Sequence, residues 1–199
     1  MAQILICWVG ATDLKASSEN ENVGLGPIAQ AAKTRSYDEI ALISNYGKGP
    51  TVPYIKWLQE KTPATITVHY EFLSSPTNFG EIYQTASRLV SDKINKYGFS
   101  VSLTFHLSPG TPAMAAVWII LSKTRFPAEL IESSREHGVR TASIPFDISA
   151  EFIPDLLRRP DSRLEKLSAG LPPNAPEFEN IIHRSRIMTP IKQLGKQTS

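Results

Sequence analysis

A short turn between two long apolar runs is the feature that most constrains how this chain can fold. The run Val101 to Leu107 precedes the sequence Ser108-Pro109-Gly110-Thr111-Pro112, and a second apolar run, Ala113 to Leu121, follows it. This order predicts a buried strand, a tight turn containing glycine, and a buried helix. Thr111 suits the N-cap of that helix. Pro112 suits its first position, because the amide hydrogen that proline lacks would have no helical partner there.

The first turn of this helix is a candidate anion-binding site. Free backbone N–H groups and the positive end of the helix dipole would lie beside the hydroxyl groups of Ser108 and Thr111. We therefore predict that phosphate or another polar ligand binds at residues 108–113. The alternative is that both hydroxyl groups only satisfy backbone groups of the turn itself.

Strand-like and helix-like segments alternate along the first 150 residues. Strands are expected at Ile4–Val9, Glu39–Ser44, Thr65–Leu73 and Val101–Leu107, with two shorter ones near 129–132 and 141–146 around a turn containing Gly138. Helices are expected from Pro27 to Lys33, from Pro53 onward, from Phe79 to Asn95, and from Pro112 to about Arg125. This alternation predicts an α/β fold: a Rossmann-like, mostly parallel sheet flanked by helices, with a C-terminal helical extension.

Two of the expected loops should meet at one edge of the sheet. In parallel α/β sheets, ligands bind beyond the carboxyl ends of the strands, where the strand order reverses. The turn Gly10-Ala11-Thr12-Asp13 follows the first strand, and the Ser108 turn follows the fourth. Gly10, Thr12 and Asp13 are therefore candidate ligand-binding residues, although a purely local capping role for Asp13 fits equally well. The G-x-G-x-x-G spacing of a dinucleotide-binding loop is absent.

Composition and charge exclude several classes of protein. A net charge of +2 gives no argument for a nucleic-acid or membrane surface. The single cysteine, Cys7, lies in an apolar run, and a protein without disulfides is expected in the cytoplasm. The four histidines show no metal-ligand spacing, so no metal site is expected. His106 lies at the end of the fourth strand, next to the proposed site, where it would hydrogen-bond a ligand or act as a base. More commonly, a histidine in such a position is half-buried and already hydrogen-bonded within the fold.

The motifs together resemble those of a known family. The strand–Ser-Pro-Gly-Thr-Pro-Ala-Met–helix element, a first strand ending in Gly-x-x-Asp, and the chain length resemble CARF domains. CARF domains are Rossmann-like sensor domains associated with CRISPR systems, and they bind cyclic oligoadenylates. Residues 118–121 and 128–134 are most similar to the CARF domain of RtcR-type sigma-54 activators of RNA repair, in which the sensor is fused to an AAA+ ATPase. Phe178 to Met188 is similar to the entry helix of such ATPase domains.

The resemblance implies a domain organisation and a set of partners. Residues 1–150 would form a CARF-like ligand-sensing domain, 151–176 a helix and linker, and 177–199 the start of a truncated AAA+ domain. ATP and Mg²⁺ are expected only for the missing part of that domain, so no cofactor is expected in this chain. The missing part would also contact sigma-54 RNA polymerase.

The resemblance further implies a homodimer that binds a cyclic oligoadenylate or an RNA terminal phosphate. The ligand would act by favouring one arrangement of the two subunits over another. The residues 108–113 would hold phosphate and ribose, and Thr12 and Asp13 would line the neighbouring wall. Bases would be contacted by Asn45 or Tyr46 and by Asn78 or Phe79.

Two other functions remain open from the sequence. The chain is either a ring-nuclease-type enzyme that cleaves its own cyclic ligand, with His106, Ser108 and Thr111 as the groups involved, or a dimerisation module with an empty site.

Overall fold

The computed structural model describes residues 1–18, 24–98 and 100–145. The chain divides into two units, Met1–Phe152 and Ile153–Ser199, and every described residue belongs to the first. The predicted helix and linker at 151–176 and the predicted AAA+ segment at 177–199 therefore lie outside the described residues. No helix in the described part of the chain is both long enough and apolar enough to cross a membrane.

The core of the unit is a six-stranded sheet with the order β3-β2-β1-β4-β5-β6. Its strands are β1 (Gln3–Trp8), β2 (Glu39–Ser44), β3 (Thr65–Tyr70), β4 (Ser102–His106), β5 (Glu129–Ser134) and β6 (Gly138–Thr141). The first five run parallel, and β6 pairs antiparallel with β5. The strand order reverses between β1 and β4, as the Rossmann-like expectation requires. The predicted Rossmann-like, mostly parallel sheet flanked by helices is confirmed. The predicted C-terminal helical extension lies outside the described residues.

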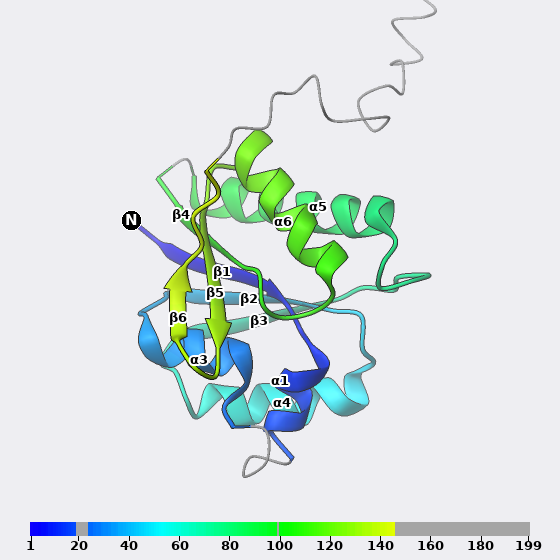
Figure 1. Cartoon of the computed structure of the whole chain (residues 1–199), viewed down its shortest axis with the longest axis vertical. Helices are drawn as coiled ribbons and strands as arrows, with labels where there is room; N and C mark the ends of the chain where they lie inside the picture. The colour runs from blue at the N-terminus through cyan, green and yellow to red at the C-terminus, as the bar shows by residue number, and fades with distance from the viewer. Residues whose placement is uncertain (19–23, 99, 146–199) are drawn as a thin grey trace, which may run out of the picture. The chain divides into compact units, whose positions relative to one another are not determined.

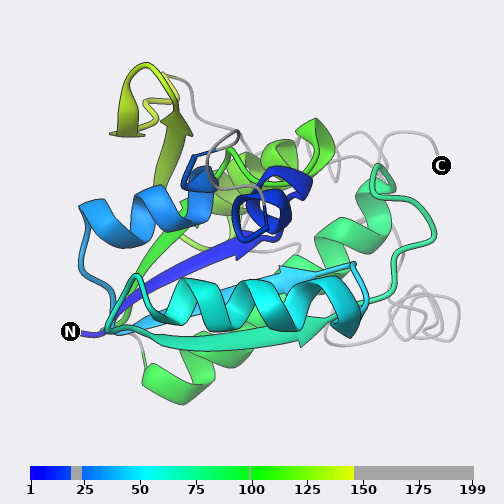
Figure 2. The same ribbon diagram turned by 90° about the horizontal axis from the view of Figure 1, so that it is seen from below.

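Helices cover both faces of this sheet (Figure 1). One face is covered by α5 (Phe79–Tyr97) and α6 (Pro112–Thr124), and the other by α1 (Ala11–Ala16), α3 (Gly26–Thr34) and α4 (Lys48–Gln59). Figure 2 shows α3 and α4 lying in front of the sheet and the β5–β6 hairpin projecting from one side. The two covered faces explain why β1 is an unbroken apolar run.

Side chains of β1 alternate between two hydrophobic clusters. Ile4, Ile6 and Trp8 pack with the residues of α5 and α6. Leu5 and Cys7 pack with those of α3 and α4. Cys7 is completely buried, and burial raises the pKa of its thiol, so it is a packing residue as predicted.

The structure corrects two predictions about the helices. The segment 10–13 after β1 was expected to be a turn, but α1 begins within it, because the Asp13 carboxylate accepts the Gly10 N–H and closes the first helical turn. The second prediction, a helix starting at Pro53, is also wrong. Helix α4 begins at Lys48, and Pro53 lies inside it. The φ to which proline is restricted is compatible with a helix, and what is lost is the hydrogen bond that the N–H of another residue would donate at this position.

Two strand predictions are also corrected. Strand β3 ends at Tyr70, whereas Leu73 lies in the following loop and packs into the core from there. An apolar side chain that is buried from a loop looks like a continuation of the strand in the sequence. Strand β6 occupies Gly138–Thr141 and not 141–146, and Gly138 begins this strand with φ of 65° and does not sit within the turn.

Candidate functional site

The loops after β1 and β4 meet at the carboxyl edge of the sheet, as predicted. These two strands are hydrogen-bonded neighbours, but β1 leads to α1 on one face and β4 leads to α6 on the other. The chain therefore separates to opposite faces at this point, which is the place in the strand order where α/β folds bind ligands.

Two glycines bring these loops into direct contact. A Cβ atom on Gly10 would lie 2.9 Å from the amide nitrogen of Gly110. Gly110 itself has φ of 93°, and a Cβ atom there would lie 2.6 Å from the sulfur of Met114 and 3.2 Å from the Cβ of Trp8. Neither position accepts a side chain without movement, so the two backbones pack directly against each other at this edge of the sheet.

The turn before α6 has the capping geometry that the sequence predicts. Thr111 is the N-cap, its hydroxyl oxygen accepts the Met114 N–H, and Pro112 stands in the first helical turn. The Thr111 N–H donates to the Met114 sulfur at 3.4 Å, and proline has no N–H. The candidate backbone donors for a ligand in this turn are therefore the N–H groups of Gly110 and Ala113. Of the predicted ligand residues here, Gly110 and Pro112 are exposed, whereas Pro109 and Ala113 are buried.

Asp13 lies inside the fold behind this edge, not on the surface. Its side chain is fully buried. One carboxylate oxygen accepts the Gly10 N–H at 3.2 Å and the other accepts the Ile28 N–H at 2.9 Å. Burial raises the pKa of Asp13 to about 7, although both of these hydrogen bonds act to lower it. Asp13 thus ties the end of β1 to the start of α3, while Thr12 is exposed on the first turn of α1.

The groups named for a nuclease are all engaged in contacts within the fold. The Ser108 hydroxyl donates to the Ser133 carbonyl oxygen at 3.0 Å and accepts the Ser133 N–H at 2.7 Å. His106 is fully buried, its Nε2 lies 2.8 Å from Ser133 Oγ, and burial lowers its pKa to about 3. A histidine with so low a pKa is a weak base near neutral pH. The Thr111 hydroxyl donates to the Pro76 carbonyl oxygen at 2.7 Å, which joins the β3–α5 loop to the Ser108 turn.

Asn78 and Phe79 stand at the start of α5, at the end of this same loop. Asn78 caps the helix, because its side-chain oxygen accepts the Glu81 N–H at 3.3 Å. Its amide nitrogen donates to the Ser74 hydroxyl, so the side chain is held within the loop. Phe79 is 53% exposed and is the more accessible of the two.

A hollow lies farther along the carboxyl edge, at the ends of β2 and β3. It has a volume of about 350 Å³ and contains Asn45 and Tyr46, which the sequence singled out as base contacts. It also contains Lys48, Tyr70 and Phe72, which sequence reasoning missed. The sequence predicts a strand from Thr65 to Leu73, and Phe72 would then be a residue of the sheet and not of an exposed loop. The charged Glu71, directly after Tyr70, was the available signal that the strand ends before Phe72.

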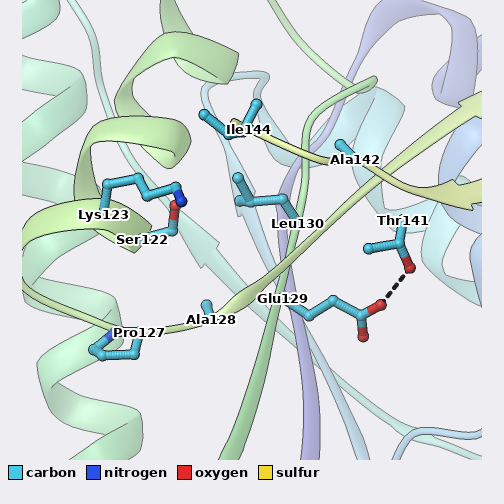
Figure 3. Close-up of a pocket in the computed structure, with 9 residues that line it drawn as sticks. All are labelled: Ser122, Lys123, Pro127, Ala128, Glu129, Leu130, Thr141, Ala142 and Ile144. Carbon is cyan, nitrogen blue, oxygen red and sulfur yellow. Dashed lines mark hydrogen bonds between the residues drawn. The ribbon is translucent and has the colours of Figure 1, made fainter. Parts of the chain in front are cut away.

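Another cleft lies at the opposite, amino edge of the sheet, beside the start of β5 (Figure 3). Its volume is about 290 Å³, and its walls include Leu130, Ala142 and Ile144. The Thr141 hydroxyl donates to Glu129 at 2.6 Å, and Arg35 pairs with the same carboxylate at 2.7 Å. None of the predicted ligand residues lies in this cleft. Within the described residues, no group of three or more His, Cys, Asp or Glu side chains is placed to hold a metal ion.

No protein-family model matches the sequence, and no curated protein matches it. Solved structures do match the fold. Csm6 from Enterococcus italicus, bound to cyclic hexa-2'-fluoro-hexa-dAMP, has a TM-score of 0.58 and 12% identity over 72% of this chain and 42% of Csm6. Can2 from Sulfobacillus thermosulfidooxidans, in complex with cyclic tetra-adenylate, has a TM-score of 0.49 and 11% identity over 67% of this chain and 32% of Can2.

The match to Csm6 shows a shared fold. The chain spans less than half the length of either of these two proteins. Its α/β domain has the mostly parallel, helix-flanked sheet of a Rossmann-like protein, which is the fold expected for a CARF domain.

Proposed function

We propose that this chain is a CARF-type sensor domain, which binds a cyclic oligoadenylate or an RNA-end nucleotide as a homodimer at the carboxyl edge of its sheet. The observation that most supports this function is the contact between Gly10 and Gly110, where the strand order reverses. The fold shared with Csm6, which was solved with a cyclic adenylate analogue, agrees with the ligand class.

The chemistry of the turn before α6 suits an anionic, phosphate-containing ligand. The amides of Gly110 and Ala113 lie at the start of α6, where the helix dipole favours negative charge. The hydroxyls of Ser108 and Thr111 already have partners in the fold, so the backbone would provide most of the phosphate contacts. Two such edges, brought together by a two-fold axis, would enclose a cyclic ligand.

The proposed regulatory role depends on the resemblance of the C-terminal sequence. The similarity of Phe178–Met188 to a sigma-54 activator ATPase suggests that the sensor controls such an ATPase in a longer protein, with sigma-54 RNA polymerase as the final partner. Binding would act by favouring one arrangement of the dimer over another. ATP and Mg²⁺ would belong to the ATPase part.

Isothermal titration of the purified chain with cyclic tetra-adenylate, cyclic hexa-adenylate and RNA carrying a 2′,3′-cyclic phosphate tests the ligand. We expect heat of binding with at least one of the three. Thr12→Asp should weaken that binding about tenfold, because it adds a negative charge beside the phosphate site. The first turn of a helix favours an acidic residue, so the fold should be retained.

Asn95→Asp is the matched control. Asn95 is exposed in the last turn of α5, at the amino edge of the sheet, and the substitution adds the same charge without changing the side-chain size. Binding by this variant should match the wild type. No heat with any of the three nucleotides would refute the sensor function.

A further inference from the structure

We propose that the hollow between the ends of β2 and β3 is a nucleotide pocket, in which a base stacks on Phe72 and Lys48 pairs with the attached phosphate. The proposal rests on the proposed function, and it names the part of the site that recognises a base. The hollow is lined by Asn45, Tyr46, Lys48, Tyr70, Glu71 and Phe72, among others.

Phe72 is the first reason for a stacking role. Its side chain is 92% exposed, more than that of any other large hydrophobic residue in residues 1–18, 24–98 and 100–145. Tyr70, at the end of β3, is 38% exposed. Single exposed apolar residues are common, but these two share one hollow with Tyr46. Exposed aromatic faces are what a nucleobase needs, because every base stacks on an aromatic ring.

The size of the hollow and its polar groups agree with a nucleotide. A volume of about 350 Å³ falls at the small end of the range for small-molecule sites. The Lys48 Nζ lies 5.8 Å from the centre of the Tyr70 ring, so the cation stands beside the aromatic wall. Asn45 offers both a donor and an acceptor for the edge of a base.

The one acidic side chain of the hollow is already paired. Glu71 forms a salt bridge with Arg88 at 2.6 Å. That partner offsets the repulsion that a carboxylate would otherwise exert on a phosphate. The groups that can contact a ligand here are therefore a lysine, an amide and aromatic rings. This set favours a nucleotide over an apolar peptide, because an apolar peptide carries no negative charge to pair with the lysine.

Fluorescence of 2-aminopurine riboside 5′-monophosphate, titrated with the full chain, tests the pocket directly. Stacking on an aromatic ring should quench the probe. Phe72→Leu keeps the apolar volume without the ring and should weaken binding about tenfold, whereas Phe72→Trp should retain it. Because Phe72 is exposed, neither change should alter the melting temperature.

Lys48 is tested by comparing nucleotides with nucleosides. Lys48→Ala should weaken the binding of AMP several-fold and leave that of adenosine unchanged, because only AMP has the phosphate. Lys56→Ala is the control, since Lys56 is an exposed lysine at the far end of the same helix. If the fluorescence of the 2-aminopurine probe is not quenched, or if Phe72→Leu binds the probe as tightly as the wild type, the proposed nucleotide pocket is refuted.

The outcome also separates this pocket from the proposed function. If cyclic oligoadenylate binds equally well to the wild type and to Phe72→Leu, the pocket is refuted and the sensor function stands. If the probe is quenched but no oligonucleotide binds, the pocket stands and the proposed sensor function is refuted.

Discussion

Replacing Glu39 with Gln should destabilise the domain strongly while leaving its ligand affinity unchanged. Glu39 is 1% exposed and lies at the start of β2, at the amino edge of the sheet. Its carboxylate pairs with Lys93, which is also buried, and accepts hydrogen bonds at 2.6 Å from the hydroxyls of Thr67 and Tyr97. These contacts join the last turns of α5 to β2 and β3 at the amino edge of the sheet, whereas the proposed site lies at the carboxyl edge.

The pKa of Glu39 sets the size of the effect. Burial alone would raise this pKa, but the hydrogen bonds from Lys93, Thr67 and Tyr97 lower it from 4.5 to about 2. A lowering of that size corresponds to about 3 kcal/mol of stability at neutral pH. Loss of one partner from a buried ion pair costs a similar amount, about 3–5 kcal/mol.

The dependence on pH distinguishes this cause from simple loss of packing. A carboxylate with a lowered pKa stabilises the fold above its unfolded pKa, and the contribution disappears as the pH falls toward the folded pKa. The difference in unfolding free energy between wild type and Glu39→Gln should therefore shrink from about 3 kcal/mol at pH 7 to about 1 kcal/mol at pH 3.

Urea unfolding at both pH values, followed by circular dichroism, measures this difference. Lys96→Met is the control, because Lys96 contacts the same carboxylate from an exposed position and should behave much like the wild type. A difference under 1 kcal/mol at pH 7, or one that is equal at the two pH values, would contradict the assigned role of Glu39.

Three further substitutions test the carboxyl edge. Gly110→Ala should lower the melting temperature and abolish oligonucleotide binding in calorimetry, because its Cβ would meet Met114 and φ is positive; unchanged binding would contradict a site at this turn. The wild type should lose stability as the pH rises from about 4 to about 7, because burial raises the pKa of the Asp13 carboxyl and the fold favours its protonated form. Asp13→Asn cannot ionise and should not show this loss; an identical dependence of stability on pH in both proteins would refute the explanation. Ser108→Ala should cost about 1–2 kcal/mol by removing two hydrogen bonds to Ser133, with no linear product from cyclic oligoadenylate in either protein by chromatography; cleavage by the wild type would favour the nuclease alternative.

Much of the sheet was predictable, because parallel strands buried on both faces leave unbroken apolar runs. The segment Glu39–Ser44 was predicted with its true bounds, and the Thr111 cap and the helix after it were expected from local rules alone. The meeting of the β1 and β4 loops was also predictable, because it follows from the strand order of the fold.

Features that depend on long-range contacts were not predictable in the same way. The sequence cannot show that Asp13 reaches Ile28, fifteen residues away, or that Ser108 binds the backbone of Ser133. Both were therefore candidates for ligand contact, and each has partners inside the fold. Phe72 was missed for the opposite reason, since an apolar residue next to a strand is expected to be buried and this one is exposed.

The central claim, that a nucleotide binds where β1 and β4 separate, is tested most directly by amide chemical shifts. Spectra of the nitrogen-15-labelled chain would be recorded with increasing cyclic tetra- or hexa-adenylate. We expect the largest shifts at the amides of Gly10, Gly110 and Ala113, with little change at Glu129 and Thr141 at the opposite edge of the sheet. Shifts confined to the opposite edge, or no shifts at all, would contradict the claim.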